Sequence, residues 1–96
     1  MNSYVLSEAA DSDIGDIARR SIAQWGFART ERYLLELHRA FETLAQFPHL
    51  GRDAGHLRSG YFRFEHESHS VFYQKVESGI FIVRVLHQKQ RPENYL

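Results

Sequence analysis

Apolar and polar positions alternate with two different periods along this 96-residue chain. A short apolar run, Tyr4-Val5-Leu6, predicts a first strand near residues 3–6. From Ser7 to Trp25 apolar residues recur every three or four positions, which predicts a helix with one buried stripe. Ser7 is the expected N-cap because its hydroxyl can accept a hydrogen bond from the first turn. Gly26 is expected to end the helix in a left-handed cap.

The helical period returns from about Ala28 to Gln46. Pro48 ends it, since the residue before a proline disfavours helical backbone. Only one or two residues around Gly26 separate the helices, so they should fold back as an antiparallel hairpin. Residues 48–60 contain several glycines and no periodicity, which is typical of a surface loop.

A period of two replaces the helical pattern after residue 60. Three strands joined by short turns are predicted: Tyr61–Glu65, His69–Val76 and Ile80–His87. The order is therefore β-α-α-β-β-β. This order indicates the α+β class, with the helix hairpin packed on one face of a mainly antiparallel sheet. We expect a single domain over residues 1–96.

The apolar stripes of the two helices and one face of the last strand are expected to form the core. The helix residues expected there are Ile14, Ile17, Trp25, Tyr33, Leu37, Phe41 and Leu44. They should bury against Phe81, Val83 and Val85 on the last strand.

The opposite face of the last strand is also apolar, since it carries Ile80, Ile82 and Leu86 around Arg84. A sheet with helices on one side needs only one apolar face. This second face therefore requires cover from the 48–60 loop, a dimer partner or a binding segment. Arg84 is expected to be a paired structural residue rather than a catalytic one.

Composition and charge exclude several classes of protein. The chain has 12 Lys and Arg against 12 Asp and Glu, so no net charge attracts it to nucleic acid or membranes. Its longest apolar run, Ile80–Val83, is far shorter than the roughly 20 residues of a membrane span. The N-terminus lacks the apolar stretch of a signal peptide. We expect a complete, soluble, cytoplasmic protein.

Six histidines and no cysteine raise the question of a metal site. His66-Glu67-Ser68-His69 falls one residue short of the zinc motif HExxH and lies in a predicted strand turn. The remaining histidines have no ligand spacing: His38, His49, His56 and His87. We therefore expect no metal, no cofactor and mostly exposed histidines. No nucleophilic serine elbow or phosphate-binding glycine loop is present.

Basic and aromatic residues gather toward the C-terminus. They are Arg84, His87, Lys89, Arg91 and Tyr95, preceded by Arg58, Arg63 and Lys75. Such a group can bind phosphates or place general acids. Nearby glutamates dilute it, so a nucleic-acid contact and an ordinary solvated surface both remain open.

Short segments along nearly the whole chain carry a family resemblance. In order they are Tyr4-Val5-Leu6-Ser7, Ala10 with Asp13-Ile14, Gln24-Trp25-Gly26, Tyr33 with Leu37, Leu44-Ala45, Pro48 with Gly51-Arg52, Leu57-Arg58-Ser59-Gly60-Tyr61, His69-Ser70-Val71-Phe72-Tyr73 and Ile80-Phe81-Ile82-Val83-Arg84-Val85-Leu86-His87. Through these segments taken together, the chain resembles the ParE toxins of the ParE/RelE superfamily, the toxic halves of bacterial type II toxin–antitoxin pairs. Their order and separation make the resemblance specific.

The resemblance implies a RelE-like fold and a ParD-like antitoxin whose C-terminal segment wraps the toxin in a hetero-oligomer. It also implies one of two activities. ParE-type members poison DNA gyrase and block replication, whereas RelE-type members cut messenger RNA on the ribosome. The Trp25-Gly26 turn and the strand Arg84-Val85-Leu86-His87 are similar to the ParE branch, which favours gyrase inhibition. No sequence-specific nucleic-acid binding by the toxin alone is expected.

Messenger RNA cleavage is the alternative. Arg63, Arg91 and Tyr95 fall roughly where a RelE-type nuclease needs cations and a tyrosine, but the middle strands otherwise offer only Glu65 and Lys75. Because this set is incomplete, we expect a binding protein rather than an enzyme. A member that keeps only antitoxin binding is a third possibility, which a growth-arrest test would separate from the other two.

Two sets of contact residues follow from these interpretations. The predicted antitoxin-binding residues are Leu35, Arg58, Lys75, Ile80, Ile82, Arg84 and Leu86, together with the outer surface of the helix hairpin. The candidate target-binding residues are His87, Lys89, Arg91 and Tyr95. The antitoxin segment is expected to be disordered when free and to fold on contact.

Overall fold

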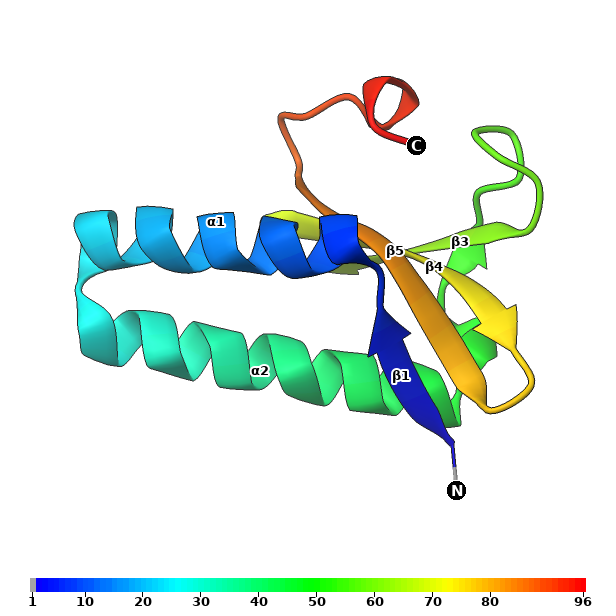
Figure 1. Ribbon diagram of the computed structural model, residues 1–96, viewed down its shortest axis with the longest axis horizontal. Coiled ribbons are helices and arrows are strands. Elements are labelled where there is room, and N and C mark those ends of the chain that lie inside the picture. The colour runs from blue at the N-terminus through cyan, green and yellow to red at the C-terminus, as the bar shows by residue number, and fades with distance from the viewer. Residues whose placement is uncertain (1) are drawn as a thin grey trace.

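The computed structural model describes residues 2–96, which form a five-stranded mixed sheet and a helix hairpin (Figure 1). The helices are α1 (Glu8–Trp25) and α2 (Phe27–Gln46). The strands are β1 (Ser3–Leu6), β2 (Arg52–Asp53), β3 (Tyr61–His66), β4 (His69–Val76) and β5 (Gly79–His87). The sheet order is β1-β5-β4-β3-β2, with β1 parallel to β5 and the other neighbours antiparallel. The predicted α+β architecture is confirmed.

Both ends of α1 lie at the predicted residues. The Ser7 hydroxyl accepts a hydrogen bond from the backbone N–H of Ala10 at 2.9 Å. Gly26 ends the helix as predicted and donates its N–H to the Ile22 carbonyl. Its φ of +85° and ψ of 172° lie in a region that is essentially restricted to glycine, but this is not the left-handed helical cap that was expected. Gly26 alone separates α1 from α2, so the two helices form a tight antiparallel hairpin.

The segment 48–60 is more ordered than a plain surface loop. It begins with a 3₁₀ turn, Pro48–Leu50, and contains the short strand β2, in which Arg52 pairs with Arg63 of β3. The expectation of a loop without strands is therefore wrong at Arg52–Asp53. The outer edge of β3 presents backbone groups that this segment satisfies. Ala54 just beyond β2 is buried.

A β-bulge in β5 changes which residues form the core. Phe72 of β4 pairs with Arg84 and Tyr73 pairs with Ile82, so Val83 is the extra residue on β5. A bulge interrupts strict alternation, and it reverses the faces on which later side chains point. The helix-side core therefore contains Ile80, Ile82 and Val85. The prediction that Phe81 and Val83 fill this core is wrong.

Most of the expected helix residues do contribute to the core. Ile17, Leu37, Phe41 and Leu44 are buried, and the half-buried Ile14 and Tyr33 pack against them. Trp25 is the exception, because its side chain is 42% exposed. It is the last residue of α1, and the hairpin tip projects beyond the sheet (Figure 1), where no strand can cover it.

The second face of the sheet carries a smaller buried group. Phe72 and Leu86 are almost fully buried, and the Arg63 guanidinium lies 5.3 Å from the centre of the Phe72 ring. The segment after β5 folds back toward this face and forms a short 3₁₀ turn, Pro92–Asn94. The Tyr95 ring in that segment lies over the Arg84 guanidinium, so the last residues of the chain supply part of the cover.

Backbone approaches backbone closely between β1 and β5. Gly79 has φ of +141°, and a Cβ at this position would lie 1.8 Å from the Ser3 carbonyl oxygen. Glycine is therefore required where β1 joins the sheet. No helix within residues 2–96 has the length and hydropathy that a membrane span requires.

Candidate functional site

An exposed apolar groove lies at the tip of the helix hairpin. A groove of about 310 Å³ is lined by Ile22 of α1 and by Phe27, Leu34 and Leu35 of α2, with Thr30 and Glu31. Phe27 is 68% exposed and Leu35 is 52% exposed. Trp25 precedes the groove residue Phe27 by two positions, and the Arg29 guanidinium lies over its ring at 4.7 Å from the ring centre. Large exposed apolar side chains gathered in this way mark a contact surface.

The amphipathic pattern explains why this surface stays open. The apolar residues of α2 occupy more of the helix circumference than the sheet can cover, so the stripe containing Leu37 is buried and Leu35 points outward. Of the predicted antitoxin-binding residues, Leu35 therefore lies on an accessible surface. Ile22, Phe27 and Leu34 were missed, although their spacing around the Gly26 turn was visible in the sequence.

Three other predicted antitoxin-binding residues are not accessible. Ile80 and Ile82 are fully buried against the helices, and Leu86 is 1% exposed on the second face. The prediction of an exposed apolar face on the last strand is wrong. Ile80 and Ile82 lie on the helix side of the sheet, Leu86 is covered, and Phe81 and Val83 of the same strand are half-buried.

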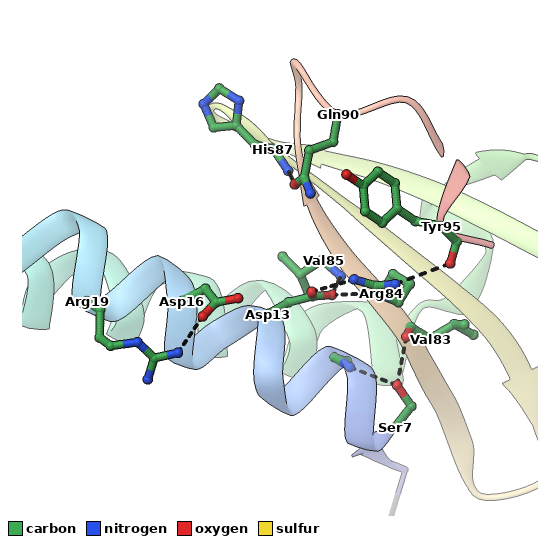
Figure 2. A network of polar contacts seen from close by, with 11 residues as sticks. Ser7, Asp13, Asp16, Arg19, Val83, Arg84, Val85, His87, Gln90 and Tyr95 are labelled. Atoms are coloured by element: carbon green, nitrogen blue, oxygen red, sulfur yellow. Dashed lines mark hydrogen bonds and ion pairs between the residues drawn. The ribbon is translucent and has the colours of Figure 1, made fainter. Parts of the chain in front are cut away.

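The basic residues of the same set have different environments. Arg58 and Lys75 are exposed, and the Lys75 ammonium lies 4.5 Å from the Phe62 ring centre. Arg84 donates Nε and a second nitrogen to the two carboxylate oxygens of Asp13, at 2.8 and 2.7 Å (Figure 2). The hydrogen bond to Asp13 raises the pKa of Arg84. The expectation of a paired structural arginine is confirmed, and Arg84 is not free to pair with a partner's carboxylate.

The Asp13–Arg84 pair belongs to a junction between α1 and β5. β1 pairs with only the first part of β5, so α1 satisfies the edge beyond it. Ser7 Oγ donates to the Val83 carbonyl at 2.7 Å, and the Val85 N–H donates to Asp13 Oδ2 at 2.9 Å (Figure 2). Side-chain groups of the helix thus replace the missing strand partner.

The residues suggested for a nuclease do not form a joint site, because each of them either makes structural contacts or is exposed. Arg63 donates to Glu65 Oε1 at 2.6 Å and to Ser70 Oγ at 3.2 Å. Burial alone would raise the pKa of Glu65, but hydrogen bonds from Ser70 and Arg63 outweigh it and lower that pKa. Tyr95 lies over Arg84, and Arg91 is exposed. Among the hydrogen bonds and ion pairs of residues 2–96, none connects any two of Arg63, Arg91 and Tyr95.

A histidine cluster was not anticipated from the sequence. His69, at the start of β4, is 9% exposed, and its Nδ1 lies 2.6 Å from the Tyr33 hydroxyl. Its ring meets the His87 ring edge-on with centroids 5.4 Å apart. Burial, followed by the neighbouring His87 and His66, lowers the pKa of His69 to about 4. The expectation of an exposed histidine is wrong here. No group of three potential metal-ligating side chains occurs in the part of the chain that the structure describes.

Acid should destabilise the fold through His69. Because the folded-state pKa lies below the ordinary value of 6.5, the unfolded chain takes up this proton first. The neutral His69 ring therefore makes its full contribution to the free energy of unfolding above about pH 6.5, and this contribution is lost as the pH falls toward 4. Wild type should therefore lose about 2–3 kcal/mol more stability between pH 7 and pH 4 than His69→Gln. Urea unfolding of both proteins at the two pH values measures this difference. His56→Gln, at an exposed histidine, should retain the wild-type profile, and an unchanged profile for His69→Gln would contradict the expectation.

Comparison with known proteins places these features in a family. Residues 4–92 match the family model described as ParE toxin of type II toxin–antitoxin system, parDE. The chain is 38% identical to Toxin ParE1 of Caulobacter vibrioides over 96 residues, covering 100% of this chain and 99% of that protein. It is also 38% identical to Toxin ParE1 of Mycobacterium tuberculosis over 87 residues, covering 90% and 89% of the two chains.

A solved structure shares the fold. It is described as the chromosomal ParDE TA system from P. aeruginosa, and one of its chains matches with a TM-score of 0.77 at 17% identity, covering 91% of this chain and 96% of that one. A RelE-like α+β toxin fold is thus confirmed for residues 2–96. The chain belongs to the ParE toxin family of type II toxin–antitoxin systems.

Proposed function

We propose that this ParE-family toxin inhibits DNA gyrase and is neutralised by a ParD-like antitoxin that docks in the groove at the hairpin tip. The observation that favours binding over RNA cleavage is the pairing of the sheet arginines. Arg63 is held by Glu65, and Arg84 is held by Asp13. A guanidinium already neutralised by a carboxylate has little capacity left to stabilise a phosphate in a transition state.

The groove supports an amphipathic segment as the antitoxin element. Phe27, Leu34 and Leu35 present apolar surface at helical spacing, which suits the apolar face of a partner helix. The exposed cations Arg58 and Lys75 remain candidates for contacts with acidic residues elsewhere in the same partner. The candidate target-binding residues lie at the far end of β5 and beyond it. His87 and Lys89 share a cavity there, and Arg91 and Tyr95 follow in the last segment.

Expression of the toxin alone separates the possible activities. Cells should filament and induce the DNA-damage response, and purified protein should inhibit supercoiling of relaxed plasmid by gyrase. The same preparation should not cut messenger RNA in a reconstituted translation reaction, and Arg63→Ala should not abolish growth arrest. Codon-dependent cleavage would establish the nuclease alternative, whereas growth without arrest would leave only an antitoxin-binding protein.

Substitutions in the groove should weaken antitoxin binding without unfolding the toxin. Phe27→Ala and Leu35→Ala each remove exposed apolar surface, and each should reduce the affinity about tenfold or more. Calorimetric titration with the antitoxin encoded beside the toxin measures this loss. Val76→Ala is the matched control, because Val76 is 44% exposed but lies at the end of β4 rather than in the groove. Equal losses in all three variants would exclude the groove as the docking site.

A further inference from the structure

A second cavity lies between α1 and the end of the sheet, and two of the candidate target-binding residues, His87 and Lys89, line it. Its volume is about 390 Å³. One wall is a stripe of α1 that includes Arg20 and Trp25, and the opposite wall includes Ser68, His69, His87 and Lys89. Residues from the helix, the β3–β4 turn, the start of β4 and the end of β5 thus converge on one space.

Hydrogen bonding orients the two imidazoles in this cavity. Burial raises the pKa of Tyr33 to about 12, so its phenol keeps its proton. The Tyr33 hydroxyl lies 2.6 Å from His69 Nδ1 and 3.4 Å from the His66 carbonyl, and the shorter distance favours donation of its proton to His69. A neutral His69 that accepts at Nδ1 carries its hydrogen on Nε2, which no hydrogen bond of residues 2–96 uses.

His87 adopts the same tautomer for an independent reason. Its Nδ1 accepts the backbone N–H of Lys89 at 3.1 Å, so a neutral ring carries hydrogen on Nε2. His69 and His87 are cross-strand partners with ring centroids 5.4 Å apart. Figure 2 shows the His87 ring at the end of β5, beyond its backbone hydrogen bond to Gln90. Two neighbouring rings that line one cavity therefore each carry an N–H at Nε2.

The uncompensated charge around this cavity is positive. Its two carboxylates already have partners, because Asp13 pairs with Arg84 and Asp16 pairs with Arg19. Arg20 and Lys89 have no carboxylate within 4.0 Å among the residues that the structure describes. An anion would meet two free cations and several neutral donors, and it would not displace an existing ion pair.

We propose that this cavity binds a phosphate monoester of nucleotide size. Donors reach the cavity from four separate segments, and a tetrahedral dianion offers more acceptor positions than a carboxylate does. Trp25, Ile17 and Val85 supply the apolar part of the wall, which suits a flat ring attached to the phosphate. The source of the phosphate is either a free mononucleotide or the 5′-phosphate end of a nucleic-acid strand, and a free mononucleotide fits the cavity size.

Trp25 provides a direct readout because it is the one tryptophan of the chain. Titration of the folded toxin with adenosine monophosphate should move the Trp25 indole N–H resonance and the His69 and His87 ring resonances in a saturable way, with a dissociation constant of about 1 mM or lower. Inorganic phosphate should compete for the site. Adenosine and acetate, at matched ionic strength, should leave these resonances nearly unchanged.

Variants distinguish a built site from general electrostatic attraction. Arg20→Gln and Lys89→Gln should each weaken binding about tenfold, whereas Arg39→Gln, at an exposed cation of α2, should change it less than about twofold. A 5′-phosphorylated oligonucleotide that binds in place of the mononucleotide would support the phosphate site and identify a strand end as its source. Absence of saturation, equal effects of all three variants, an equal response to acetate, or binding of an acidic peptide alone would overturn the proposal. Gyrase inhibition is measured without nucleotide monophosphate, so failure here is distinct from failure of the proposed function.

Discussion

Replacing Asp13 with asparagine is expected to lower the free energy of unfolding by about 3 kcal/mol, near the lower end of the range for breaking a buried ion pair. Asp13 is 11% exposed and Arg84 is 20% exposed, so the guanidinium would keep a largely desolvated charge without its counter-ion. Asp13 also accepts the Val85 N–H, so the substitution weakens the junction of α1 with β5 as well. Urea denaturation of the purified toxin measures the change.

The control lies one turn further along the same helix. Asp16 pairs with Arg19, but these side chains are 54% and 71% exposed. Water and salt screen such a pair, so Asp16→Asn should cost less than about 1 kcal/mol. Both variants remove one negative charge from α1, but only Asp13 has a largely buried partner and a hydrogen bond from the Val85 N–H. Equal losses of stability would mean that helix electrostatics, and not the buried pair, is responsible.

Truncating Leu37 to alanine is expected to cost about 3–4 kcal/mol, within the range seen for large-to-small changes in cores. Leu37 is 1% exposed and belongs to the cluster that contains Phe41 and Ile82, where the helix hairpin meets the sheet. Removing its side chain deletes buried apolar surface and leaves a cavity that the rigid sheet cannot fill. Thermal and urea unfolding should both report the loss.

Leu35→Ala is the matched comparison for Leu37→Ala. Leu35 is 52% exposed on the same helix, and its truncation should change stability by less than about 0.5 kcal/mol. The two leucines should therefore separate folding from binding, since Leu35→Ala affects antitoxin affinity and Leu37→Ala affects stability. A large loss of stability for Leu35→Ala would show that the groove is part of the core.

Local patterns were sufficient for the two helices and for every strand except the short β2. Ser7, Gly26 and Pro48 mark ends of α1 and α2, and each acts on backbone groups within a few residues. The change from a helical period to a period of two located β3, β4 and β5 to within one residue at each end. Such features depend on neighbouring residues, so a single sequence contains the information that specifies them. The family resemblance then supplied the toxin class.

Which side chains of each strand point toward the core, and which residues form the candidate site, depended on contacts between distant residues. One extra residue on β5, Val83, exchanged the expected core positions and placed Ile80 and Ile82 under the helices. No local pattern predicts such a bulge, because it depends on how β5 pairs with β4 on one side and with β1 and α1 on the other. The apolar groove was only partly foreseen, through Leu35 and the outer surface of the helix hairpin.

The order β-α-α-β-β-β, which lacks only the short strand β2, the helix boundaries and the membership in the ParE family could all be determined from the amino-acid sequence. Tertiary structure alone brought Asp13 to Arg84, 71 positions away, and Tyr33 to His69, 36 positions away. It also decided that Trp25 stays exposed while Leu86 is buried, and that the Tyr95 ring of the last segment lies over Arg84. The physical reason is that short-range hydrogen bonding and periodicity set the elements, whereas burial and charge pairing are settled only when the elements pack together.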